Sequence, residues 1–175
     1  MSTAGQETGA EVGASRRLAT PVAHLDGFVG AHPSALERIY LGARPADPGE
    51  LGASPRGRLL AVAPLSRVFL MVRPVMRALA TDLLPWQGKV FDHGGNSGQN
   101  RVLGGKAFRF RAEVAASRVD GKPALVLRYG DPAYRNPWPV RAVTDELRCV
   151  GTGVAIGPAY FDDELVLWWG LEAAR

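Results

Sequence analysis

Three polar side chains are candidates for acid–base chemistry, and two of them lie in largely apolar surroundings. Tyr129 follows a run of aliphatic residues, Asp145 lies within the alternating segment Val140–Val150, and His93 opens a polar loop. A phenol, a carboxylate and an imidazole can each hold or move a proton, or stabilise charge that develops on a bound molecule. If the protein is an enzyme, we expect these three side chains to be its catalytic residues.

A second group of candidates could form the walls of a binding cavity. Aromatic rings supply apolar surface, and their phenol and indole hydrogens can orient a guest, while an arginine would meet its polar end. The predicted ligand-binding residues are Trp86, Phe91, Phe108, Phe110, Arg128, Tyr134, Trp138, Arg141, Tyr160 and Trp168. The same aromatic residues could instead fill the interior, and we favour a cavity.

Other common chemistries lack the residues they need. The three histidines are widely spaced and the chain has one cysteine, so we expect no metal site. The glycine-rich stretch from His93 to Asn100 lacks the GxxxxGK[ST] pattern and is expected to be a loop. We therefore predict no cofactor.

Short alternating segments separated by turn signals must position the candidate residues. Such spacing is typical of antiparallel strands, and a strongly twisted sheet removes its exposed edges by closing. The predicted strands are Arg56–Ala63, Trp86–Phe91, Leu103–Val119, Ala124–Tyr129, Val140–Val150, Val154–Phe161 and Leu165–Leu171. We expect a mainly β (α+β) fold, a closed or nearly closed antiparallel barrel of about seven to nine strands.

The rest of the chain is expected to form a tail and two helices. Residues 1–22 contain few large apolar groups and are predicted to be a flexible tail, which leaves 23–175 as a single barrel domain. Helical spacing of apolar residues occurs at about 33–42 and 65–84. The second helix is expected to plug or flank the barrel.

Composition narrows the partners and the compartment. The net charge is +4, but most arginines alternate with apolar residues, as expected for a strand with one wet face, so no nucleic-acid partner is predicted. The single cysteine and the absence of an apolar leader favour the cytoplasm. A peripheral contact with an anionic membrane, and a monomer or a homodimer, remain open.

Several motifs resemble those of a bacterial family of small, uncharacterised lipocalin-like proteins, of the calycin type. They are the W-x-G-K-x-F-D segment from Trp86 to Asp92, the Asn136-Pro137 pair and the Asp145-Glu146-Leu147 triplet. The similarity spans residues 34 to 172. It implies a small barrel that binds a hydrophobic molecule, and it carries no catalytic residues to transfer.

These observations lead to three competing functions. The first is binding of a hydrophobic small molecule, of acyl, polyketide or terpenoid type, in a barrel cavity. The second is a cofactor-independent cyclase or isomerase of specialised metabolism, working by cycloaddition or proton transfer in the same cavity. The third is a peripheral membrane-associated structural protein that uses the helix at 65–84.

Overall fold

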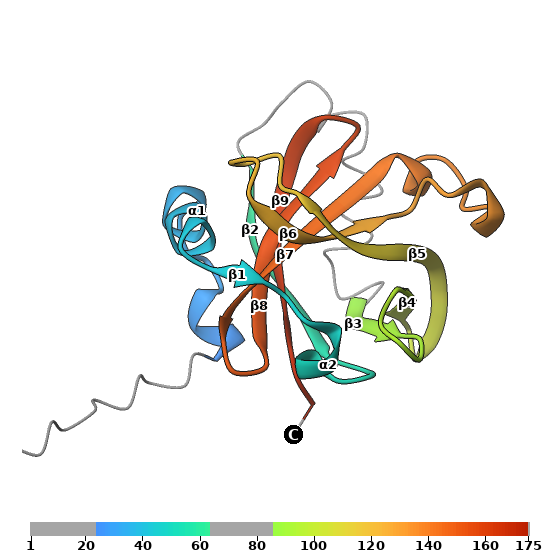
Figure 1. Ribbon diagram of the computed structural model, residues 1–175, viewed down its shortest axis with the longest axis horizontal. Coiled ribbons are helices and arrows are strands. Elements are labelled where there is room, and N and C mark those ends of the chain that lie inside the picture. The colour runs from blue at the N-terminus through green and yellow to red at the C-terminus, as the bar shows by residue number, and fades with distance from the viewer. Residues whose placement is uncertain (1–23, 64–85, 175) are drawn as a thin grey trace, which may run out of the picture.

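The computed structural model describes residues 24–63 and 86–174. Within these ranges eight antiparallel strands form a barrel in which each strand pairs with the next along the chain. The strands are β2 (Arg56–Val62), β3 (Trp86–Phe91), β4 (Ser97–Val102), β5 (Gly105–Ala116), β6 (Pro123–Arg128), β7 (Val143–Gly151), β8 (Val154–Phe161) and β9 (Glu164–Glu172). β9 returns to β2 and closes the ring (Figure 1). The predicted closed antiparallel barrel is confirmed.

Short elements lie outside or at the end of this barrel. Strand β1 (Arg44–Pro45) pairs in antiparallel fashion with the C-terminal half of β7. Helix α1 (Pro33–Leu41) packs against the outer faces of β7 and β8, and the short helix α2 (Pro48–Leu51) lies at the lower end of the barrel in Figure 1. The remaining elements are single 3-10 turns: η1 (Leu25–Phe28), η2 (Pro132–Tyr134) and η3 (Val140–Ala142).

Two apolar cores follow from strand alternation. Inward-facing residues such as Phe110, Leu127 and Leu147 form the core inside the barrel, to which Leu51 of α2 contributes. Outward-facing Ile156 and Trp168 form a second core with Leu36 of α1 and its neighbours. Because α1 covers the outer wall, every residue of β8 is buried, on both faces of the strand.

One strand was missed in the sequence. The segment expected to be a polar loop ends in β4, which pairs with β3 on one side and β5 on the other. Its inward positions are Gly98 and Asn100, so it shows no apolar alternation. A side chain at Gly98 would collide with the ring of Phe110, with a Cβ only 2.6 Å from the ring. The barrel fills that position with a neighbour's aromatic ring instead.

Two expected segments fall outside the described residues, namely the tail 1–22 and the helix 65–84. The helix expected at 33–42 is confirmed as α1. None of the helices in the described ranges is long and apolar enough to cross a membrane.

Candidate functional site

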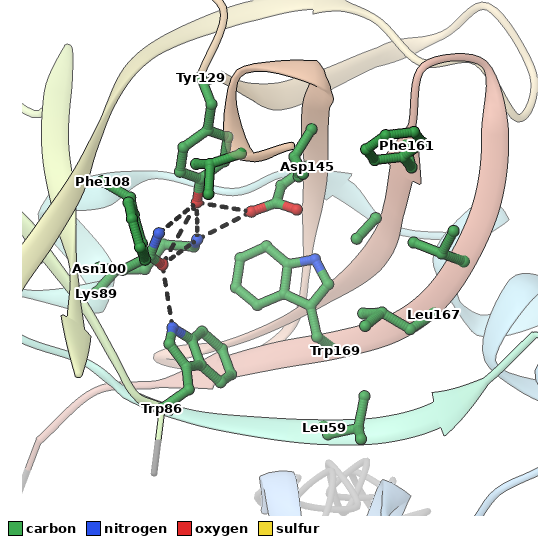
Figure 2. Close-up of a pocket in the computed structure, with 14 residues that line it drawn as sticks. Leu59, Trp86, Lys89, Asn100, Phe108, Tyr129, Asp145, Phe161, Leu167 and Trp169 are labelled. Atoms are coloured by element: carbon green, nitrogen blue, oxygen red, sulfur yellow. Dashed lines mark hydrogen bonds and ion pairs between the residues drawn. The ribbon is translucent and has the colours of Figure 1, made fainter. Parts of the chain in front are cut away.

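A cavity of about 120 Å³ occupies one part of the barrel interior. Partly exposed apolar side chains such as Leu59, Val143 and Leu167 line it together with buried ones. Figure 2 shows these walls around a single group of polar side chains. The polar lining residues are Lys89, Asn100, Tyr129 and Asp145. The cavity is therefore apolar except for one localised cluster.

Lys89 is the centre of this polar cluster. Its ammonium donates hydrogen bonds to Asp145 Oδ2 at 2.9 Å, to Asn100 Oδ1 at 3.0 Å and to the Tyr129 hydroxyl oxygen at 2.5 Å. Tyr129 donates to the same Asp145 Oδ2 at 3.0 Å and accepts from Asn100 Nδ2 at 3.1 Å. All three protons of the ammonium are thus engaged, and one carboxylate balances its charge.

Strand register brings these four residues together. Asn100 on β4 lies directly opposite Lys89 on β3. On β7, Asp145 alternates with inward-facing Val143 and Leu147, so its carboxylate also faces the interior. Tyr129 immediately follows β6, the neighbour of β7, and its side chain belongs to the same interior core.

A β-bulge adds Trp86 to the group. On β3 two residues, Gln87 and Gly88, occupy the space where β4 supplies one, and Gly88 has a φ of 129° that favours glycine. The extra residue turns Trp86 to the same face as Lys89, and its indole Nε1 donates to Asn100 Oδ1 at 3.0 Å. Gly57 on β2 leaves room for that indole, because a Cβ there would lie 2.4 Å from it.

The Lys89 ammonium also lies among aromatic rings. The centroids of Trp169, Phe110, Tyr129 and Trp86 are 4.4, 5.1, 5.2 and 5.6 Å from its Nζ. Ring quadrupoles attract a cation at these distances. Burial nevertheless lowers the pKa of Lys89, against the opposing effect of Asp145. Burial likewise raises the pKa of Tyr129 well above its ordinary value, so its hydroxyl remains a proton donor at neutral pH.

A comparison with solved structures shows the fold. A protein from Thermomonospora curvata, known from its crystal structure, matches with a TM-score of 0.56 over 86% of this chain and 93% of that chain, at 14% sequence identity. The two proteins share a fold. The fold is a closed antiparallel barrel of the lipocalin-like type. No family model matches the chain, and no curated protein matches it.

Four of the residues selected from the sequence line the cavity. Tyr129 and Asp145 are in direct contact there, and Trp86 and Phe108 form part of its wall. Phe108 occupies a bulge between β4 and β5 with a φ of 57°, a conformation that costs energy for a bulky side chain. Phe91 and Phe110 lie in the barrel core but do not line the cavity, because they fill the space behind Tyr129.

The structure places His93, Arg128 and Arg141 away from the cavity. His93 is exposed in the turn between β3 and β4. Arg128 points outward because its neighbour Tyr129 points inward, and it pairs with Glu113 at 2.8 Å. Arg141 is exposed in η3, before the alternation of β7 begins. None of the three lines the cavity.

Four aromatic candidates also lie away from the cavity. Tyr134 is half-buried beside Arg109, and Trp138 is exposed, with its edge near Phe161. Tyr160 and Trp168 face outward from β8 and β9, where Trp168 packs against Tyr40 of α1. The sequence shows that these strands carry large aromatic residues, but an inward and an outward ring look alike until α1 is placed.

The predicted site residues did not include Lys89, Asn100 or Trp169. Lys89 is two residues from Phe91 on a predicted strand, so alternation alone indicated a lysine on the buried face. Asn100 could not be found because its segment was expected to be a loop. Trp169 and its neighbour Trp168 face opposite sides of the barrel wall, and Trp168 takes the outer side, where it packs against Tyr40 of α1. Across the described ranges, no group of three or more His, Cys, Asp or Glu side chains is placed to hold a metal ion.

Proposed function

We propose that this barrel binds a small, mainly apolar molecule with one polar group. The observation that supports the proposal is the cavity itself, apolar on most of its wall and charged in one place. Tyr129 and Asp145 would meet the polar end of the guest, and Trp86 and Phe108 its apolar body. The motifs that resemble those of lipocalin-like proteins also support this proposal.

The size of the cavity narrows the guest. An apolar protein cavity of about 150 Å³ is known to hold benzene, and the cavity here measures about 120 Å³. Of the acyl, polyketide and terpenoid classes expected from the sequence, a single ring or the compact end of a larger molecule fits this volume. A guest of about seven heavy atoms that is buried in this cavity should bind with a Kd of about 0.1 to 1 mM.

Toluene is a suitable probe because it offers an apolar ring and no polar group. We expect saturable binding to the purified protein by calorimetry and by chemical-shift changes of the Trp86 and Trp169 indole protons. Ala159 lines the cavity, so Ala159→Leu fills it and should weaken binding by at least about tenfold. Val114→Leu adds apolar volume on the exposed surface and is the matched control. Toluene binding that survives Ala159→Leu unchanged would place the ligand elsewhere and reject the proposal.

A second candidate is a cofactor-independent isomerase. The contact between Tyr129 and Asp145 favours it, because a carboxylate next to a phenol can remove a proton from carbon while a hydrogen bond stabilises the enolate. In 3-cyclohexenone, Asp145 would take the proton from C2 and return it to C4, which yields the conjugated ketone. A rise in its ultraviolet absorbance that Asp145→Asn abolishes would support this candidate. Conversion at the buffer rate would exclude it for this probe. The membrane-associated alternative depends on residues 65–84, which lie outside the described residues.

A further inference from the structure

Trp169 presents an unused hydrogen-bond donor to the cavity. Its indole lines the cavity and is 3% exposed. Among the described residues no acceptor lies within hydrogen-bond distance of Nε1, although that atom is buried. Figure 2 shows this nitrogen on the side of the ring that faces Asp145 and Phe161. A buried donor without an acceptor costs free energy, so a group that accepts its hydrogen bond would gain affinity.

Asp145 presents an unused acceptor to the same cavity. Its Oδ2 atom receives the bonds from Lys89 and Tyr129, and no hydrogen bond within the described part of the chain reaches Oδ1. Figure 2 shows the second carboxylate oxygen turned away from Tyr129, toward the space above Trp169. The cavity therefore offers one donor and one acceptor on the same side.

The charges in the cluster disfavour an anionic guest. Lys89 is the cation that lines the cavity, and all three of its protons are bonded to Asn100, Tyr129 and Asp145. A carboxylate or phosphate would find no free positive group among the described lining residues and would face the negative charge of Asp145. Desolvation of an unpaired anion costs far more than one indole hydrogen bond returns.

We propose that the polar group of the guest is a neutral hydroxyl, which donates to Asp145 Oδ1 and accepts from Trp169 Nε1. This inference rests on the proposed binding function and names the chemical class of its ligand: a phenol or a compact alcohol. A hydroxyl provides a donor and an acceptor on one atom. A carbonyl oxygen would satisfy Trp169 but place its lone pairs against the carboxylate, and an aromatic amine donates well but accepts poorly.

Toluene, phenol and aniline test this assignment because they have the same shape and differ only in the substituent. We expect Trp169→Phe to weaken phenol binding about threefold to tenfold, as for loss of one hydrogen bond. Toluene should lose less affinity than phenol in this variant, because both compounds lose contact with the indole wall and only phenol loses a hydrogen bond. Aniline should bind less tightly than phenol to the wild-type protein, and benzoate should not bind measurably. Asp145→Asn is a second variant, which should weaken phenol binding more than toluene binding.

The outcomes separate the two proposals. Toluene binding together with phenol binding that Trp169→Phe leaves unchanged would overturn the hydroxyl assignment and retain the cavity. Equal losses for toluene and phenol in that variant would also overturn it, since they would report lost packing. Failure of both compounds to bind the wild-type protein would overturn the binding function and, with it, the hydroxyl assignment. Benzoate binding tighter than phenol would show that the cluster attracts an anion and would likewise overturn the assignment.

Discussion

Lys89 and Asp145 form an ion pair inside the barrel, with 2.9 Å between Nζ and Oδ2 and side chains only 2% and 8% exposed. The two residues come from β3 and β7, which are not adjacent in the ring of strands. A pair of this kind is costly to bury and is tolerated when the remaining hydrogen-bonding groups are satisfied. Tyr129 and Asn100 provide that satisfaction for the Lys89 ammonium and for Asp145 Oδ2.

Removal of one partner of this pair should destabilise the protein strongly. Lys89→Met leaves Asp145 as a buried, uncompensated carboxylate, so we expect the free energy of unfolding to fall by about 3–5 kcal/mol. The double variant Lys89→Met with Asp145→Leu removes both charges and should recover most of that loss. Urea unfolding followed by tryptophan fluorescence measures both. A single variant that loses less than about 1 kcal/mol would contradict the burial of the pair.

Alkaline pH should destabilise the protein through its buried tyrosines. Burial raises the pKa of Tyr129 well above the ordinary 10.0, and it raises the pKa values of Tyr40 and Tyr160 as well. The unfolded chain releases these protons near pH 10 whereas the folded chain keeps them, so the free energy of unfolding falls as pH rises above about 10. Each tyrosine contributes a slope of up to about 1.4 kcal/mol per pH unit.

Tyr129→Phe should reduce this alkaline slope by the contribution of one group. Lys89 acts in the opposite direction, because burial lowers its pKa and its contribution to stability rises with pH up to about 10.5. The comparison therefore keeps Lys89 in both proteins. Urea unfolding between about pH 8 and about pH 11 measures the slope, and an identical slope in Tyr129→Phe and wild type would show that Tyr129 titrates normally.

Arg128 and Arg141 should be dispensable for ligand binding. Both are exposed outside the barrel, and Arg128 forms a surface pair with Glu113. Such pairs contribute about 0–1 kcal/mol, so Arg128→Ala and Arg141→Ala should change the free energy of unfolding by less than about 1 kcal/mol. Toluene and phenol affinities should stay within about twofold of wild type. A loss of binding in either variant would mean that a basic side chain reaches the guest.

The stability of the packing between α1 and the barrel should depend on the hydroxyl of Tyr40. Tyr40 donates a hydrogen bond at 2.9 Å to Glu146, a carboxylate that is 1% exposed. Tyr40→Phe removes a bond to this buried charge and should cost about 1–3 kcal/mol of stability while leaving toluene affinity unchanged. Tyr134→Phe is the matched control, since no hydrogen bond to its hydroxyl occurs among the described residues. Equal stability of the two variants would contradict the role of Tyr40 in attaching α1.

Much of the barrel was predictable because its strands show a local alternation of apolar and polar residues. Trp86–Phe91 and Val154–Phe161 were predicted with the bounds that β3 and β8 have in the structure. Val143, Asp145 and Leu147 alternate along the predicted strand Val140–Val150, and all three face the interior. β4 escaped prediction because its inward positions are a glycine and an asparagine, which carry no apolar period.

The sequence by itself determined that strands would close into a ring and that Tyr129 and Asp145 were fit for a polar site, since both follow from residue type and a period of two. Tertiary structure alone decided which aromatic residues reach the cavity and that Lys89 and Asn100 join them. Bulges at Gln87 and in β9 change the facing of side chains by one position, and α1 buries the outer face of β8 as deeply as its inner face. Local sequence records neither effect, because each depends on how distant strands and helices pack together.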